Sequence, residues 1–168
     1  MASRKLDDLQ PETREKALLF LELAKDAEFP VLIYCTYRSD HEQACLYRQS
    51  RSLPVIKHKA DQLRFNFGRP DLAQLLMDVG PQYGRHVTNA GPGQSLHGYR
   101  CALDGVPLVG GKPVWDDDTP EERAIWARYG ELVELAGLEW SGRWTQFKET
   151  PHAQEPGMDW RELIKRGP

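Results

Sequence analysis

Hydrophobic residues follow a helical period near the start of the chain and then gather in a short continuous run. Leu, Phe and Ala recur at three- and four-residue spacing over 11–27, which predicts an amphipathic helix. The run at 31–37 contains β-branched and aromatic residues and is typical of a buried strand. Ser39, with Glu42 three residues later, has the pattern of a capping box, so we expect a second helix that carries Gln43.

The rest of the chain shows more helical than strand patterns. Thr119, Pro120 and Glu122 combine an N-cap, a proline at the first helical position and a returning acid, which predicts a helix over 119–136. The other predicted elements are a helix over 71–79, strands over 95–109 and 138–144, a loop from there to 154, and a short C-terminal helix. Because helices and strands do not alternate regularly, these elements favour an α+β fold, a single domain over 1–168 with a small antiparallel sheet flanked by helices.

The composition narrows the classes of function. With 168 residues, 40% of them hydrophobic and 28% charged, the chain has enough apolar side chains for one globular core. The 22 Lys and Arg residues nearly balance the 25 Asp and Glu residues, which argues against a dedicated nucleic-acid-binding protein. No apolar run approaches the roughly 18–20 residues of a membrane span, and residues 1–8 lack the apolar region of a signal peptide. We expect a soluble monomer made in a cytoplasm.

The cysteines give no sign of a structural framework. There are three, Cys35, Cys45 and Cys101, and their spacing is not paired. An odd number without paired spacing argues against both a disulfide framework and a zinc site made of cysteines alone. We predict free thiols without a catalytic role.

Two segments that contain histidine carry the candidate chemistry, 95–104 and 147–152. Catalytic zinc sites take three protein ligands from His and Asp or Glu and leave a fourth position for water. His97, Asp104 and His152 could supply this set, with Glu149 free to act as a base. In a strand, Asp104 and Cys101 would lie on opposite faces, which turns the thiol towards the core. Spacing alone leaves open that both histidines are structural.

The order of residues in these segments resembles that of a known family. The pattern Ser-x-His-x-x-x-x-Ala-x-Asp at 95–104, followed by Glu-x-Pro-His at 149–152, is similar to the zinc peptidases of peptidoglycan. That group includes D-alanyl-D-alanine carboxypeptidases, vancomycin-resistance D,D-dipeptidases and phage L-alanyl-D-glutamate endopeptidases. Further segments resemble the phage endolysin branch, namely 6–11, 36–47, 87–90 and 140–144.

The resemblance implies a role for individual residues. His97, Asp104 and His152 match the zinc ligands, and the zinc would lie in a surface groove. Glu149 matches the general base, and Arg38 matches an arginine beside the zinc-bound water that stabilises the oxyanion. The resemblance also places Ser95 and Gln43 near the ligands, where they would contact substrate or orient the ligands.

The sequence departs from the family pattern at a few places. Arg100 stands where Gly is usual, Glu149 where the phage branch more often has Asp, and Ala153 where an aromatic residue is usual. The segment 52–86 is longer than in the relatives, and we interpret it as a candidate lid, insertion or extra substrate wall. For the tryptophans of the 140–144 segment, core packing is favoured over a platform that stacks on sugar rings.

The function that the resemblance implies is a zinc-dependent endolysin that hydrolyses the L-Ala–D-Glu bond of the peptidoglycan stem peptide during host cell lysis. Such an enzyme would be made in the host cytoplasm and would reach the cell wall after the membrane is permeabilised. Two alternatives stay open: a D-Ala-D-Ala carboxypeptidase, and a degenerate zinc-binding protein of the cell wall without activity. Arg38 and Glu149 argue against degeneracy, because a purely structural zinc site needs neither.

Overall fold

The computed structural model describes residues 2–166, and the chain divides into two compact units. One is a helical unit that contains residues 38–99 and 159–166, and the other is a sheet unit that contains residues 3–37 and 100–158. The prediction of a single domain over 1–168 stays a prediction. Within the described residues, no helix is both long enough and apolar enough to span a membrane.

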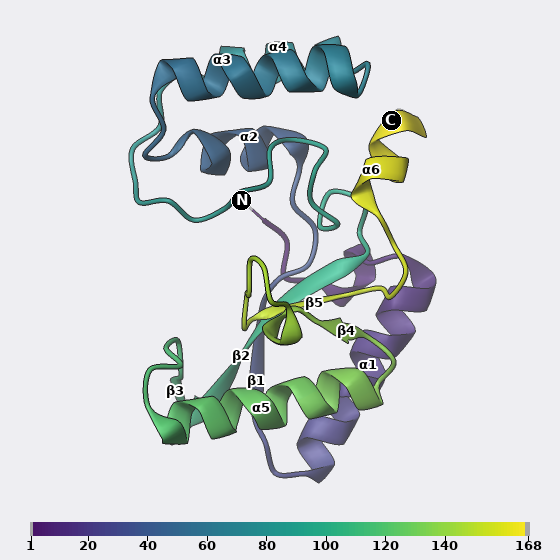
Figure 1. The fold of residues 1–168 in the computed structure, drawn as a ribbon. Coiled ribbons are helices and arrows are strands. Elements are labelled where there is room, and N and C mark those ends of the chain that lie inside the picture. Colours follow the sequence, from purple (N-terminus) through teal and green to yellow (C-terminus); the bar gives the residue numbers. More distant parts are fainter. Residues whose placement is uncertain (1, 167–168) are drawn as a thin grey trace. The chain divides into compact units, whose positions relative to one another are not determined.

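The helical unit is built from short helices around one hydrophobic cluster (Figure 1). Its elements are α2 (Asp40–Arg48), α3 (Leu53–Asp61), the π-helical turn η2 (Gln62–Asn66), α4 (Pro70–Asp78), α6 (Trp160–Leu163) and η4 (Ile164–Arg166). The predicted capping box of α2 is confirmed, because Ser39 Oγ accepts a hydrogen bond from the Glu42 amide at 3.3 Å and the Glu42 carboxylate accepts one from the Ser39 amide at 3.4 Å.

Helix α3 is an element that the sequence analysis missed. Its buried residues, Ile56 and Ala60, are four positions apart, and Leu63 continues the same face into η2. Lys57, His58 and Lys59 lie between them and make the segment look polar. The segment 52–86 therefore forms much of the core of the helical unit.

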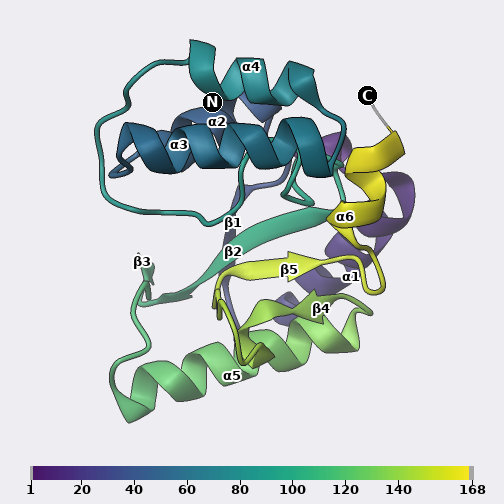
Figure 2. The ribbon, with the colours of Figure 1, turned by 45° about the horizontal axis from the view of Figure 1, so that its top comes forward.

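The sheet unit contains the antiparallel sheet and the two longest helices. Its elements are η1 (Leu6–Asp8), α1 (Pro11–Asp26), β1 (Val31–Cys35), β2 (Ala102–Val109), β3 (Lys112–Pro113), α5 (Pro120–Leu135), β4 (Glu139–Trp140), η3 (Ser141–Arg143) and β5 (His152–Gln154). The strand order is β1-β2-β5-β4, with β3 paired to β2. Helices α1 and α5 lie on one side of the sheet (Figure 2), as the predicted α+β class requires.

The core of the sheet unit explains which face of β2 is free for chemistry. Leu103 is fully buried in the cluster that contains Phe20 of α1 and Tyr129 of α5. Gly105, two residues later on the same face, lies so close to the Tyr129 hydroxyl that a Cβ there would come within 2.8 Å of it. Asp104 therefore faces away from the two helices.

The strand predictions need three corrections. The strand expected over 95–109 begins only at Ala102, because hydrogen-bonded turns occupy the residues from Ser95 to Tyr99 and Arg100 has a positive φ of 63°. The loop expected up to 154 contains β5, which forms because it pairs with β2 on one side and β4 on the other. The expected strand at 138–144 is also shorter than predicted, since η3 follows directly after Trp140.

Candidate active site

Strand pairing brings together two of the three predicted zinc ligands. Asp104 on β2 lies directly opposite His152 on β5 in the antiparallel register. The distance from Asp104 Oδ1 to His152 Nδ1 is 3.0 Å, and each residue is 8% exposed. A buried carboxylate oxygen and a buried imidazole nitrogen therefore face one point.

Contacts within the sheet unit hold His152 in place. Its Nε2 lies 3.2 Å from Oε1 of Gln154, and its backbone carbonyl accepts a hydrogen bond from Ser141 Oγ at 3.1 Å. The Trp144 ring lies beside the imidazole, with 6.1 Å between the ring centroids. These contacts restrict both the strand and the ring of His152.

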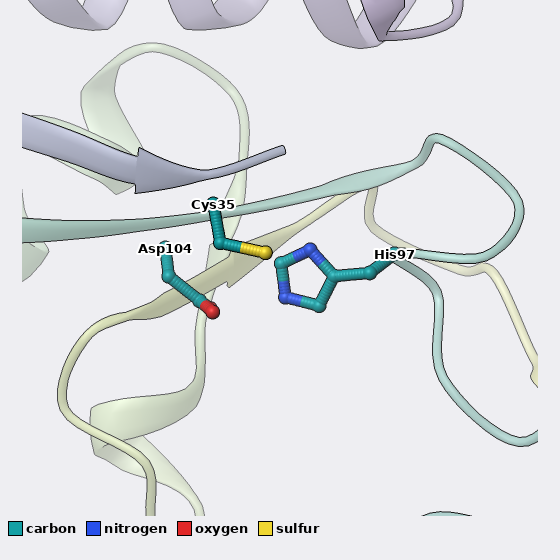
Figure 3. Close-up of side chains that lie close together, drawn as sticks. All are labelled: Cys35, His97 and Asp104. Atoms are coloured by element: carbon teal, nitrogen blue, oxygen red, sulfur yellow. The ribbon is translucent and has the colours of Figure 1, made fainter. Parts of the chain in front are cut away.

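Cys35 is a neighbour of this pair that the sequence analysis did not assign to the site. It ends β1, next to Asp104 on β2, and its Sγ lies within 4.8 Å of a carboxylate oxygen of Asp104. Figure 3 shows the side chains of Cys35 and Asp104. In the sequence, Cys35 lies within the predicted strand at 31–37 and directly precedes the Thr-Tyr-Arg-Ser segment, but only the pairing of β1 with β2 brings it next to Asp104.

Cys101, which was expected to face the core, is 5% exposed and hydrogen-bonds with Thr13 of α1. Burial raises the pKa of its thiol, and the nearby Glu155 carboxylate adds to this shift. The Cys101 thiol therefore stays protonated at neutral pH and is a poor metal ligand. All three cysteines are free thiols.

The helical unit holds the other predicted site residues. Arg38 donates from Nη1 to Oε1 of Gln43 at 3.1 Å, and its backbone amide donates to the carbonyl oxygen of His97 at 3.4 Å. Gln43 is 2% exposed and donates from Nε2 to the Ala90 carbonyl oxygen at 2.7 Å. His97 is 2% exposed, and the turn that contains it is closed by a 3.1 Å hydrogen bond from the Gly98 amide to the Ser95 carbonyl.

Glu149 lies on an exposed loop of the sheet unit just before β5. The loop is fixed on both sides of this residue. Trp140 Nε1 donates to the Thr150 carbonyl at 2.7 Å, and Lys148 forms an ion pair of 2.7 Å with Asp117. Glu139, another acid of this unit, differs from Glu149 because its carboxylate accepts a hydrogen bond from the Trp144 indole at 2.7 Å.

Trp140 is a core residue, since it is 7% exposed and belongs to the hydrophobic cluster under the sheet. The preference for core packing is thus confirmed for Trp140. Trp144 is half-buried and lies beside His152.

Arg100, the most unusual residue of the motif, has a left-handed backbone conformation. Its φ of 63° lies in the left-handed region that glycine adopts without strain, which accounts for glycine in the family pattern. The guanidinium carbon lies 4.7 Å from the centroid of the Tyr37 ring, and the residue is exposed. Arg100 therefore stacks on an aromatic ring of its own unit.

The donor set of the sheet unit fits a zinc ion. Zinc in catalytic sites is bound by His nitrogen and by Asp or Glu oxygen, and Asp104 and His152 offer one of each in a buried place. A buried carboxylate is costly without a positive partner, and a bound cation supplies one. The phenol of Tyr129 does not act as a second acidic group beside Asp104. Burial and the charge of Asp104 raise the pKa of this phenol well above the ordinary value.

Comparisons with known proteins agree with this chemistry. Residues 88–155 match the family model described as D-alanyl-D-alanine carboxypeptidase. The chain is 26% identical over 151 residues to the peptidoglycan L-alanyl-D-glutamate endopeptidase CwlK of Bacillus subtilis (strain 168). The matched region covers 88% of this chain and 73% of that protein.

Two solved structures share the fold. One is the L-Ala D-Glu endopeptidase ChiX of Serratia marcescens, with a TM-score of 0.50, 18% identity, and coverage of 98% of this chain and 92% of that one. The other is a mutant of the vancomycin resistance D,D-pentapeptidase VanY in complex with Zn(II), with a TM-score of 0.50, 13% identity, and coverage of 94% and 78%.

Proposed function

Because this chain is a zinc metallopeptidase of the D-alanyl-D-alanine carboxypeptidase family, we propose that it hydrolyses the L-Ala–D-Glu bond of the peptidoglycan stem peptide. The observation that carries the proposal is the buried pair of Asp104 and His152, which lies inside the segment that matches the family model. The names of CwlK and ChiX, both L-Ala–D-Glu endopeptidases, support the choice of bond.

Each predicted site residue receives a role in this proposal. His97, Asp104 and His152 would hold the zinc ion. When bound, zinc polarises the scissile carbonyl and lowers the pKa of a bound water to about 7. Glu149 would accept the proton of the attacking water and return it to the leaving amine, a role worth about 10²–10⁴-fold in rate.

The remaining site residues, Arg38, Gln43 and Ser95, would stabilise charge on the substrate or orient other side chains. Arg38 would stabilise the negative charge that develops on the carbonyl oxygen, and a side chain aimed before the reaction does this without reorganisation. Gln43 accepts a hydrogen bond from Arg38 at 3.1 Å, so its role is to aim the guanidinium. Ser95 would contact the substrate or orient a ligand.

The stacking of Arg100 on Tyr37 supports an endopeptidase over a carboxypeptidase. A carboxypeptidase needs a cation that holds the terminal carboxylate of its substrate. Arg100 is the unexpected cation of the zinc motif, and its guanidinium is engaged with an aromatic ring 4.7 Å away. An endopeptidase has no need of such a cation, because its substrate continues beyond the scissile bond.

For the biological role, we propose that this protein is a phage endolysin that acts as a monomer and lyses the host cell. The support is the resemblance of segments 6–11, 36–47, 87–90 and 140–144 to that branch. For the long segment 52–86 we keep the proposal of a lid or an extra substrate wall; within its own unit, its helices α3 and α4 supply much of the core.

Mass spectrometry of purified muropeptides digested with the zinc-loaded protein tests the proposal. We expect L-Ala to stay attached to muramic acid and the released peptide to begin with D-Glu. Release of free D-Ala would favour a carboxypeptidase. No cleavage at all by the zinc-loaded protein would favour a zinc-binding protein without activity, and His152→Ala serves as the inactive control.

A further inference from the structure

Gln154 lies two residues after His152 on β5, so both side chains leave the strand on the same face. Gln154 Oε1 lies 3.2 Å from His152 Nε2, and Gln154 is 9% exposed, so this hydrogen bond is shielded from water. On the other side of the ring, His152 Nδ1 lies 3.0 Å from Asp104 Oδ1. The imidazole is therefore held between an amide oxygen and a carboxylate oxygen.

These two contacts select one form of the ring when zinc is bound. Both neighbouring oxygens only accept hydrogen bonds, so the single proton of a neutral imidazole can serve only one of them. A zinc ion held by Nδ1 and Asp104 would leave Nε2 as the nitrogen that carries the proton. The amide oxygen of Gln154 would then accept that proton's hydrogen bond and hold the ring in this orientation.

We propose that Gln154 is a positioning residue that fixes the tautomer and the orientation of His152 for zinc binding through Nδ1. The inference rests on the proposed function, in which His152 is a zinc ligand. Gln154 is well placed for this role, because β5 is paired on both sides, with Ala102 opposite Gln154 on β2 and Glu139 opposite it on β4. Residues that hydrogen-bond to the second nitrogen of a ligating histidine commonly change metal affinity by about 10–100-fold.

Zinc affinity measured by competition with a chelator tests the role of the amide oxygen. Gln154→Leu removes the acceptor and is expected to weaken zinc binding by about 10–100-fold. Gln154→Glu keeps an acceptor oxygen and should bind zinc about 10-fold more tightly than Gln154→Leu.

The chain offers a matched control for this measurement. Gln62 also hydrogen-bonds to a histidine, but as a donor: its Nε2 lies 3.1 Å from Nε2 of His58, and this pair is exposed on the helical unit. Gln62→Leu should leave zinc affinity unchanged.

Nitrogen-15 NMR of the zinc-loaded protein at pH 8.5 provides a readout that is independent of activity. We expect His152 to carry its proton on Nε2 in the wild type and in Gln154→Glu, and a mixture of tautomers in Gln154→Leu. A proton on Nδ1 in the wild type, or wild-type zinc affinity in a folded Gln154→Leu protein, would overturn the inference. If Gln154→Leu does not fold, the wild-type tautomer still decides.

The failure of the proposed function looks different. A wild-type protein that binds no zinc, or a His152→Ala variant that keeps full zinc occupancy, would remove His152 as a ligand. In either case the NMR spectrum would show no His152 nitrogen bound to zinc, whereas failure of the inference about Gln154 alone would leave His152 bound to zinc.

Discussion

Arg100 departs from the usual glycine of its motif at a position where the backbone is left-handed. The left-handed φ of 63° costs a non-glycine residue about 1–2 kcal/mol, and stacking on Tyr37 returns about 0.5–1 kcal/mol at an exposed site. We predict that Arg100→Ala, which loses the stacking and keeps the strained backbone, is less stable to urea than Arg100→Gly by about 1 kcal/mol. Equal stability of the two variants would contradict a backbone reason for glycine in the motif.

The second prediction at this scale concerns Glu149, whose carboxylate is exposed on a loop that is anchored around it. Glu149→Gln should keep zinc and fold and lose about 10²-fold or more in kcat, as expected for a removed general base. Glu149→Asp should keep part of the activity, because the shorter acid can still accept a proton.

Glu139→Gln is the matched control for this prediction. The amide oxygen of Gln can still accept the hydrogen bond of the Trp144 indole, so we expect kcat close to that of the wild type. The opposite pattern, with full activity in Glu149→Gln and loss in Glu139→Gln, would identify Glu139 as the base.

Site residues that belong to a sequence motif were predictable from the sequence. Residues that only the strand register brings to the site were not. Asp104 and His152 were predicted as site residues from their residue types and order, and the register of β2 and β5 places them opposite each other. Cys35 and Gln154 reach the same place through pairing across β1, β2 and β5. No local pattern indicates such pairing, because register depends on partners that are distant in sequence.

At the scale of elements, the helices that begin with a capping box were predicted well because this signal is local, whereas α3, which has no side-chain cap, was missed. The capping boxes of α2 and α5 lie within four residues each, and both are confirmed. The short strand β5 has no local signal. Its three residues form a strand only because β2 and β4 pair with it, so the sequence alone indicated a loop.

Packing between α5 and β4 gives a prediction at the same scale. Replacing a helical glycine by alanine usually stabilises a helix by about 1 kcal/mol. A Cβ at Gly130 of α5 would overlap the six-membered ring of Trp140 on β4. We therefore expect Gly130→Ala to destabilise the protein by about 1–3 kcal/mol in urea unfolding, the range for overpacked cores.

A double-mutant cycle separates this clash from other effects. Trp140→Phe shortens the ring that meets Gly130, so Gly130→Ala should cost less in that background than in the wild type. The same comparison should show changes in activity, since Trp140 Nε1 donates to the Thr150 carbonyl next to Glu149. An unchanged cost of Gly130→Ala in the Trp140→Phe background would refute the clash as the cause.

At the scale of the whole molecule, the class of fold followed from the balance of helical and strand patterns, whereas the division into two compact units did not. The helical unit is assembled from residues 38–99 and 159–166, and no break in composition marks either boundary. Units of this kind are defined by which apolar faces pack together. Ile164, for example, joins the cluster of Ile56 and Leu72 from the far end of the chain.

Zinc removal tests the link between the site and the stability of the whole protein. We predict one zinc per chain by elemental analysis. An ion that binds only the native state adds about 2.7 kcal/mol when its free concentration is about 100 times its Kd. For a chain of this length, chelation should therefore lower Tm by about 5–10 °C.

The histidine variants decide whether that stabilisation comes from the proposed ligands. His152→Ala should have a Tm that no longer responds to chelation, because its buried donor is lost. His41→Ala, at an exposed position of α2, should respond as the wild type does. Full zinc occupancy and an unchanged response in His152→Ala would show that the stabilising ion is held elsewhere, and the assignment of Asp104 and His152 as a zinc-binding pair would then be wrong.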